Sequence, residues 1–197
     1  MADSLYLSLW FPSFDGPEIL TRTVSVLRQL PFSATRDGVN YVAVQPVSWS
    51  EPTIFEQRFR PGVSPEIAVA GVAEFLHDDY AYVFEAYWDL WTPLDNAENW
   101  VLEPALVRLT AHGAEFEEGA AEQIGHIQID FGLDTWFLHE EVELTGAAER
   151  NIRSNVQKLV EFTANVEKNA GATGRLLWSE SEENLAQKLI NRLQRVQ

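Results

Sequence analysis

The fold is decided by residues 80–91, whose sequence is Tyr-Ala-Tyr-Val-Phe-Glu-Ala-Tyr-Trp-Asp-Leu-Trp. Half of this stretch is aromatic, and aromatic residues are enriched in β-strands. Successive side chains of a strand point to opposite faces. One face would hold only core-forming residues: Tyr80, Tyr82, Phe84, Ala86, Trp88 and Leu90. The other face mixes carboxylates with aromatic rings, so the stretch predicts a long strand with one buried face and one polar face.

Further strands and helices are predicted on both sides of this stretch. Apolar runs bounded by Pro, Gly or Asp predict strands at residues 5–11, 41–45, 53–59, 105–111 and 124–131. Pro17 and Glu18 favour the first turn of a helix that ends before Pro31. A second helix is expected to begin at Pro65, and residues 92–104 are expected to form a loop.

The two helix starts share a pattern. Gly16-Pro17-Glu18-Ile19 resembles Ser64-Pro65-Glu66-Ile67, and each helix lies between two predicted strands. The offset is about 45 residues, and the strand–helix–strand order is that of a ferredoxin-like β-α-β unit. We therefore expect a ferredoxin-like unit, which is duplicated if the two helix starts are related. The alternative is that Pro and Glu recur by chance because they are common at helix starts.

The C-terminal quarter has the periodicity of helices. Ile152, Val156 and Leu159 repeat at helical spacing, and Ser179 with Glu182 has the pattern of a capping box for a last helix. We predict an α+β fold with a mostly antiparallel sheet, extended by extra strands. Residues 1–144 would form the sheet domain, and residues 145–197 a C-terminal helical hairpin packed on it as one structural unit.

The excess charge of the chain is confined to one block. Residues 61–150 contain nineteen Asp and Glu but only Arg108 and Arg150 as basic residues, which gives −17 in a chain of net charge −16. Net charge affects partners and solubility rather than fold. Without a basic patch, direct binding to nucleic acid by phosphate neutralisation is not expected.

Composition also limits the chemistry and the location. The chain has no cysteine, which excludes disulfides, thiolate metal sites and thiol nucleophiles. No run approaches the roughly 20 apolar residues of a membrane-spanning helix. We expect an acidic, soluble, cytoplasmic protein with no membrane partner.

The first group of candidate site residues lies on the polar face of residues 80–91. Glu85, Tyr87, Asp89 and Trp91 would combine carboxylates with flat rings, which suits a sugar, a cation or a basic peptide. Alternatively, the acids only keep that face hydrated. Glu85 and Asp89 would be about 13 Å apart on one strand, farther than the roughly 5 to 9.5 Å between glycosidase carboxylates. Either could pair with Asp130 across strands.

The second group is His126, Gln128 and Asp130, which would share one strand face. His126 and Asp130 are again about 13 Å apart, so a metal would require another element, such as Asp134 or His139. A hydrated polar face is the alternative. No nucleotide-binding loop or nucleophile elbow occurs. We predict no catalytic residue, no metal and no cofactor.

Three functions follow as competing hypotheses. The first is a protein-interaction module whose acidic and aromatic strand face binds a basic protein, as a neutraliser resembling an antitoxin or immunity protein or as a mimic of nucleic-acid charge. The alternative is an enzyme or binding protein for a sugar or other polar small molecule that uses the same carboxylates. The third is a homodimer formed through the C-terminal helices or a sheet edge.

Overall fold

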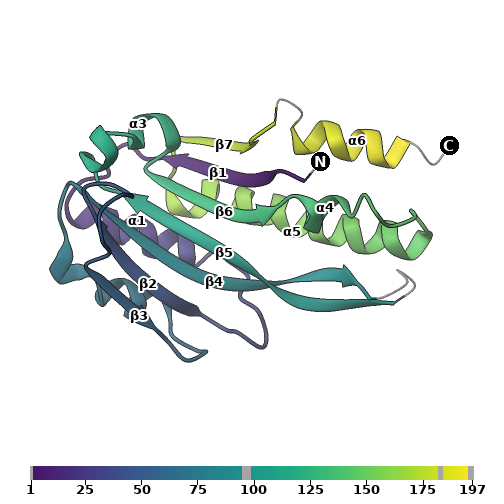
Figure 1. Cartoon of the computed structure of the whole chain (residues 1–197), viewed down its shortest axis with the longest axis horizontal. Coiled ribbons are helices and arrows are strands. Elements are labelled where there is room, and N and C mark those ends of the chain that lie inside the picture. Colours follow the sequence, from purple (N-terminus) through teal and green to yellow (C-terminus); the bar gives the residue numbers. More distant parts are fainter. Residues whose placement is uncertain (1, 95–98, 182–183, 195–197) are drawn as a thin grey trace.

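The described part of the chain forms one antiparallel sheet of seven strands with helices on one face (Figure 1). The computed structural model describes residues 2–94, 99–181 and 184–194. The strand order is β3-β2-β4-β5-β6-β1-β7. The strands are β1 (Ser4–Trp10), β2 (Val39–Pro46), β3 (Phe55–Arg58), β4 (Tyr80–Pro93), β5 (Trp100–His112), β6 (Ile127–Leu133) and β7 (Gly174–Ser179). The helices are α1 (Pro17–Leu27), α2 (Pro65–Ala70), α3 (Ala121–Ile124), α4 (Thr135–Leu138), α5 (Gly146–Ala170) and α6 (Leu185–Gln194). The prediction of an α+β fold with an antiparallel sheet is confirmed.

The strand predicted at residues 80–91 is confirmed, and it lies in the interior of the sheet, third in the strand order. It is β4, and it pairs with β5 from Ala81 opposite His112 to Pro93 opposite Trp100. The predicted core face is buried except at its first residue, Tyr80, which is partly buried: Tyr82, Phe84, Trp88 and Leu90 expose none of their surface. The Trp88 ring packs against Phe131, with the ring centres 5.3 Å apart. The alternation of the sequence therefore determines which face of β4 meets the core.

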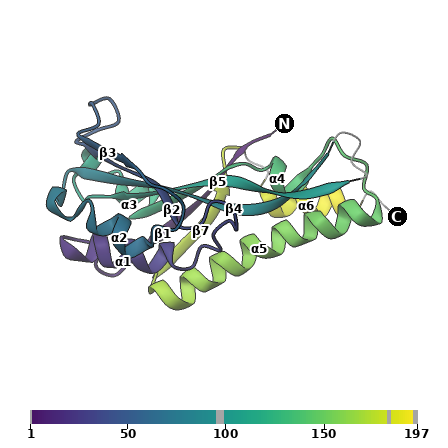
Figure 2. The ribbon, with the colours of Figure 1, turned by 90° about the horizontal axis from the view of Figure 1, so that it is seen from below.

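Helices α1, α2 and α5 all lie on that core face (Figure 2). Helix α5 runs for 25 residues, begins with Thr145, whose hydroxyl accepts a hydrogen bond from the Ala148 amide, and ends at Gly171 in a left-handed conformation. Its buried side includes Leu159 and Phe162. We call the opposite side of the sheet, on which none of these three helices packs, the open face.

The predicted C-terminal hairpin is not confirmed, because β7 lies between α5 and α6. This strand pairs with β1 from Leu5 opposite Ser179 to Trp10 opposite Gly174. Ser179 therefore ends a strand and does not cap a helix, and Glu182, its predicted partner, lies outside the described residues. Helix α6 is instead preceded by Asn184, whose side chain accepts a hydrogen bond from the Gln187 amide at 2.9 Å. Part of the segment 145–197 thus belongs to the same sheet as residues 1–144.

The ferredoxin-like unit and its duplication are also not confirmed. In a β-α-β unit of that type the strands joined by the helix lie close together, with one strand between them. Here β1 and β2, which α1 connects, are separated by β4, β5 and β6. The long β4–β5 pair and β6 fill the middle of the sheet. The predicted loop at 92–104 is shorter than expected because β5 begins at Trp100, and residues 95–98 of it lie outside the described residues.

A buried ionic cluster fastens α6 to the rest of the molecule. The Lys188 ammonium contacts the carboxylates of Asp3 and Asp134, and all three side chains are at most 8% exposed. The Asp3 amide also donates to Asp134 Oδ1 at 3.1 Å. One turn later, the Arg192 guanidinium donates to the carbonyls of Leu138, His139 and Val142. We call Asp3, Asp134 and Lys188 the Lys188 latch.

Candidate functional site

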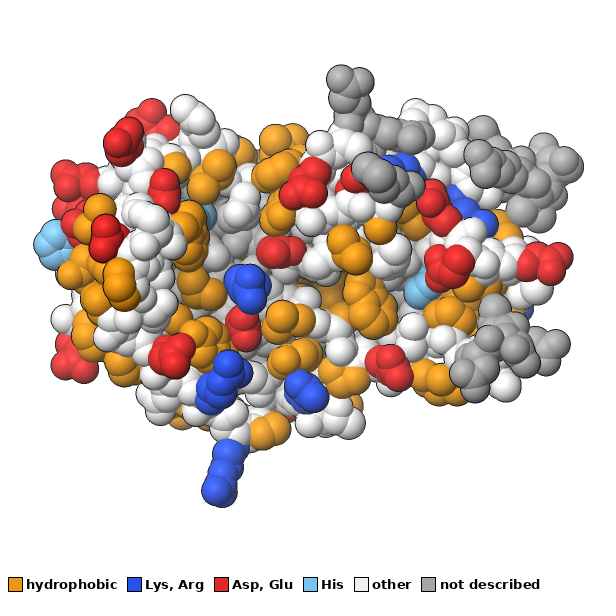
Figure 3. Space-filling model, viewed as in Figure 1, with side chains coloured by type: hydrophobic (Ala, Val, Ile, Leu, Met, Phe, Trp, Pro, Cys, Tyr) orange, Lys and Arg blue, Asp and Glu red, His pale blue; other side chains and the backbone are white. Residues whose placement is uncertain are grey.

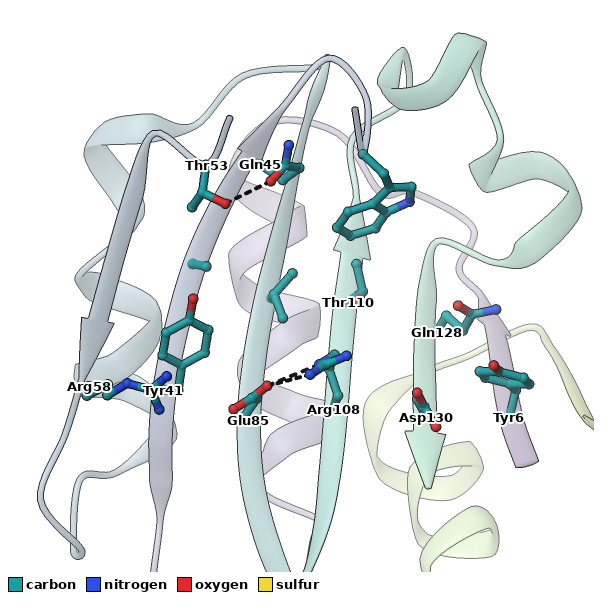
Figure 4. Close-up of a pocket in the computed structure, with 13 residues that line it drawn as sticks. Tyr6, Tyr41, Gln45, Thr53, Arg58, Glu85, Arg108, Thr110, Gln128 and Asp130 are labelled. Carbon is teal, nitrogen blue, oxygen red and sulfur yellow. Dashed lines mark hydrogen bonds and ion pairs between the residues drawn. The ribbon is translucent and has the colours of Figure 1, made fainter. Parts of the chain in front are cut away.

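The open face contains a hollow of about 560 Å³. Its walls and floor come from strands β1 to β6 and from the loop after β2, and Figure 4 shows the lining residues. Figure 3 views the same face of the molecule, where side chains of both charges gather over the middle of the sheet. The arrangement of the hollow follows from the register of the strands.

One row of directly paired residues crosses the open face from edge to edge. In an antiparallel sheet, directly opposite residues lie side by side on one face. Each member of the row is the register partner of the next: Arg58, Tyr41, Glu85, Arg108, Asp130, Tyr6 and Trp178. We call these seven residues the cross-strand row. They place charged and aromatic side chains, from segments far apart in the sequence, in one line.

The hollow exists because the neighbouring row has short side chains. This neighbouring row lies two positions farther along each strand. Its members Ala43, Val83 and Thr110 are register partners and form part of the floor. The loop at 47–54 rises beside them, on the side of the sheet away from α1 and α5 (Figure 2). Small residues below and a raised loop beside them leave space above the sheet.

Hydrogen bonds to residues outside the loop hold it in place. The Thr53 hydroxyl donates to Gln45 Oε1 at 3.0 Å (Figure 4), and the Trp49 amide donates to Glu117 Oε1 at 2.7 Å. The Trp49 ring packs edge-on against Phe116, with the ring centres 5.1 Å apart, yet 49% of the residue is exposed. The wall of the hollow therefore presents an aromatic ring to solvent.

Beneath Trp49 lies a buried histidine. The ring centres of His112 and Trp49 are 6.4 Å apart, and His112 is 1% exposed. Burial lowers the pKa of His112 to about 4. At neutral pH the ring is uncharged, and its Nδ1 is 3.1 Å from the Gly125 carbonyl oxygen, which fits a donated hydrogen bond. His112 thus supports the wall of the hollow without adding charge to it.

The cross-strand row has two carboxylates, Glu85 and Asp130, and two guanidinium groups, Arg58 and Arg108, but these charges are unevenly paired. Arg108 donates twice to Glu85 Oε1, at 2.8 and 3.1 Å (Figure 4). Asp130 Oδ1 accepts the Gly132 amide at 2.7 Å, and no residue in the described ranges forms an ion pair with Asp130. Arg108 lies in register between the two carboxylates but contacts only one of them.

Two tyrosines of the row are bonded to further carboxylates, one near each end of the row. The Tyr41 hydroxyl donates to Glu56 at 2.9 Å, and the Tyr6 hydroxyl donates to Glu180 at 3.4 Å. Burial raises the pKa of both tyrosines, so both remain protonated donors at neutral pH. Each hydroxyl is thus bonded to a further carboxylate next to the row.

The structure brings three of the seven predicted site residues together at the hollow. These are Glu85, Gln128 and Asp130. Tyr87, Asp89 and Trp91 continue along β4 on the same face but outside the hollow.

Those three residues of β4 have local partners. The Arg36 guanidinium lies over the Tyr87 ring at 4.5 Å, and Asp89 Oδ2 accepts the Ala34 amide at 2.9 Å. The Trp91 backbone exchanges hydrogen bonds with the Asn155 side chain of α5. They therefore shape the strand beyond the hollow.

His126 lies apart from Gln128 and Asp130, although strand alternation placed all three together. It precedes β6, and its Nδ1 accepts the Phe11 amide at 3.0 Å. Its ring stacks on Phe14 with 5.0 Å between ring centres. Burial lowers the pKa of His126, which favours the neutral, accepting ring. His126 thus holds the segment after β1 in place.

Sequence reasoning missed the other residues that line the hollow, among them Tyr6, Tyr41, Trp49 and Arg108. Arg108 had a signal, since it is one of only two basic residues in the acidic block and falls on a predicted strand. Tyr6 alternates with the apolar residues Leu5 and Leu7 and could have been assigned to a polar face. Their meeting at one place depends on strand register, which alternation does not specify.

An apolar strip continues the open face beyond the hollow. Leu106 and Leu102 of β5 share the face of Arg108, and they are 37% and 49% exposed. Their register partners on β4 are Tyr87 and Trp91. Hydrophobic side chains run along the β4–β5 pair in Figure 3. The open face therefore combines a charged hollow with an exposed apolar strip.

Neither a metal site in the described part of the chain nor a known relative indicates a function for this protein. Among the residues that the structure describes, no group of three or more His, Asp or Glu could hold a metal ion, and no helix is long and apolar enough to cross a membrane. No family model matches the chain, and no curated protein or solved structure shows significant similarity to it. What the protein does is therefore inferred from the open face alone.

Proposed function

We propose that the protein is a protein-interaction module that binds a basic partner through the open face of its sheet. The observation that carries this proposal is that the hollow and the apolar strip adjoin on one face of the sheet and are not covered by the helices α1, α2 and α5, which pack on the other face. A surface of this kind has the two parts of a recognition site: polar groups that select a partner and apolar groups that lose water on contact.

Charge supports a basic partner. The chain has a net charge of −16, and the cross-strand row with its hydroxyl partners contains Glu56, Glu85, Asp130 and Glu180 against Arg58 and Arg108. Complementary charge accelerates encounter and rejects acidic competitors. Exposed charges are screened within about 10 Å at 0.1 M salt, so the association rate should fall as salt rises.

The apolar strip supports a macromolecular partner. Leu102 and Leu106 lie outside the hollow, where a small ligand in the hollow would not cover them. Burial of exposed apolar surface against a partner is favourable, at about 25 cal/mol per Å². The strip therefore favours an occupant that is larger than the hollow.

Affinity capture with matched variants tests this proposal. The immobilised protein is exposed to an extract of its source cells at low salt and at 0.5 M salt, alongside a Leu102→Asp/Leu106→Asp variant and the control Ile67→Asp on α2. Ile67 is 61% exposed and belongs to the helix-covered side. We expect wild type and control to retain a partner whose binding is weaker at 0.5 M salt. The double variant should not retain it. Equal retention by all three proteins would refute the proposal.

A second candidate is a binding protein or enzyme for a sugar or another polar small molecule. It is favoured by the volume of the hollow, about 560 Å³, which falls within the roughly 300 to 1,000 Å³ of ligand sites, and by the exposed Trp49 ring. Calorimetry against a panel of mono- and oligosaccharides distinguishes the two. Binding that is lost in Trp49→Ala but unchanged in Leu102→Asp/Leu106→Asp supports the small ligand.

Self-association and location complete the proposal. Strand β7 is a sheet edge with exposed Leu176 and Leu177, which could pair with a second copy to form a homodimer. Light scattering at two protein concentrations tests this. We also propose a cytoplasmic location, because a chain without cysteine suits a reducing compartment.

A further inference from the structure

We infer that the hollow receives an arginine side chain of the protein partner, with Asp130 as its carboxylate and Tyr6 as its aromatic platform. This inference rests on the proposed function, because it names the group by which a basic partner would be recognised. It follows from four observations: an unpaired carboxylate, an aromatic ring next to it, space above both, and the use of the same pairing elsewhere on this face.

Asp130 is oriented but not neutralised. The Gly132 amide holds its Oδ1 at 2.7 Å, and Arg108, its register partner on β5, donates both of its bonds to Glu85. Figure 4 shows the Glu85–Arg108 pair joined by dashed lines and Asp130 standing beside it without one. A fixed carboxylate that lacks a cation is prepared for an incoming one, since little reorganisation is required on binding.

Tyr6 is the register partner of Asp130 on the other side of the row. Its ring stacks on Trp178, with 4.6 Å between ring centres and 29° between the planes. This stacking fixes the Tyr6 ring beside the carboxylate. A guanidinium that pairs with Asp130 would therefore meet an aromatic ring whose orientation is already set.

The open face already pairs guanidinium groups with tyrosine rings at two other places. Arg58 lies over Tyr41 at 4.9 Å, and Arg36 lies over Tyr87 at 4.5 Å. Both tyrosines are neighbours of Glu85 on this face. Tyr6 lies at the same kind of position next to a carboxylate, and no described residue places a cation over its ring.

The hollow has room for a side chain but is shallow enough to remain open to a partner. Its volume is about 560 Å³, and its floor is made of short side chains such as Ala43, Val83 and Thr110. Gln128 lines it on β6 and adds an amide next to Asp130 along the strand. A planar guanidinium can stack on a ring and bond a carboxylate with two parallel hydrogen bonds, which an ammonium cannot do. The site therefore favours arginine over lysine.

Titration with short peptides tests the inference on the full chain. The amide spectrum of the ¹⁵N-labelled protein is recorded with Ac-Gly-Arg-Gly-NH₂ and with Ac-Gly-Lys-Gly-NH₂. We expect the arginine peptide to shift the amides of Tyr6, Arg108 and Gly132, and to bind several-fold more tightly than the lysine peptide. Shifts spread over the exposed acids at both ends of the molecule, with none at these three amides, would overturn the inference.

Two variants of equal charge provide the control. Asp130→Asn keeps the oxygen that accepts the Gly132 amide and removes the charge, whereas Glu74→Gln removes an exposed carboxylate from the helix-covered side. We expect Asp130→Asn to weaken the arginine peptide about tenfold and Glu74→Gln to leave it unchanged; equal affinities in the two variants would overturn the inference. If partner capture responds to Leu102→Asp/Leu106→Asp but not to Asp130→Asn, the interaction module stands and the arginine site fails. If the arginine peptide binds at Asp130 but capture does not respond to the leucine changes, the module fails.

Discussion

The Lys188 latch and the middle of the cross-strand row contain the same charges but differ in burial and in pairing. Each places one basic residue between two carboxylates. In the latch, Lys188 contacts both Asp3 and Asp134, and all three side chains are buried. In the row, Arg108 contacts only Glu85, and 48% of its side chain is exposed. A charged triad that is closed off from water holds the fold together, whereas one that is half paired and exposed remains available to a partner.

The largest expected effect comes from breaking the latch. Lys188→Met would leave two buried carboxylates without a cation, and breaking a buried pair by removing one partner is strongly destabilising. We expect the Tm at pH 7 to fall by about 5 °C or more, as measured by calorimetry. The control Lys168→Met removes an exposed lysine near the end of α5. Equal melting temperatures for the two variants would contradict the role of the latch.

The same variant predicts a pH dependence. The hydrogen bond from Lys188 holds the pKa of Asp3 below its usual value of 3.8. A lowered pKa in the folded state stabilises the protein above that usual value, and this stabilisation is lost as the pH falls through the folded-state pKa. The Tm difference between wild type and Lys188→Met should therefore be largest near neutral pH and smaller at pH 3, about one unit below the usual value.

Other groups change the stability of both proteins alike in this experiment. Burial lowers the pKa of His112 to about 4, so the unfolded chain binds its proton first and stability falls between about pH 6.5 and 4. His112 is the same in wild type and variant, and its contribution cancels from their difference. A Tm difference that stays constant from pH 7 to pH 3 would show that Asp3 is not linked to Lys188.

The third prediction is the opposite of the one for the latch: a change in the row should affect binding and leave the stability almost unchanged. Asp130→Asn should weaken binding of the arginine peptide about tenfold while changing the Tm by less than about 2 °C, because Asp130 forms no ion pair with a described residue and asparagine keeps the bond to Gly132. Peptide titration and calorimetry on the same sample measure both quantities. A large loss of Tm would mean that the open row, like the latch, maintains the fold.

The smallest effect is expected at the paired carboxylate of the row. Glu85→Gln removes one ion pair, in which the Arg108 side chain is 48% exposed and the Glu85 side chain 16% exposed. Solvent-accessible ion pairs contribute about 0.2–1 kcal/mol. Denaturant unfolding should show a change within this range. The variant also releases Arg108, which can then turn to Asp130, so we expect weaker binding of the arginine peptide than in wild type. Stronger binding would show that the released Arg108 does not neutralise Asp130 and would contradict this prediction.

The sequence predicted the strands, the helices and the buried strand face better than it predicted which strands lie next to one another. The alternation of residues 80–91 correctly assigned Trp88 to the core, because burial of one strand face is a local property of the pattern. It did not predict β7, whose sequence from Gly174 to Ser179 lacks alternation and lies between two helical segments. The pairing of Tyr6 with Trp178 joins the two ends of the chain, and no local pattern specifies such a contact.

The candidate site shows the same division. The alternation of side chains along a strand was enough to assign Glu85, Gln128 and Asp130 to polar faces, and all three line the hollow. That Arg108 lies between Glu85 and Asp130 depends on the register of three strands, which turns and core packing determine. His126 shared the period, but Gly125, with φ of 103°, turns the chain just before β6, and the ring packs on Phe14 instead.

The two outer strands of the sheet have a consequence for aggregation. Strand β3 is four residues long, and its exposed Glu56, Gln57 and Arg58 make it a poor template for another chain. Strand β7 is longer and exposes Leu176 and Leu177. A sheet with one protected edge can add a neighbour at one side only, and two copies joined through β7 would have no free edge of that kind left. Association through the sheet would therefore stop at a pair and would not propagate into a fibre.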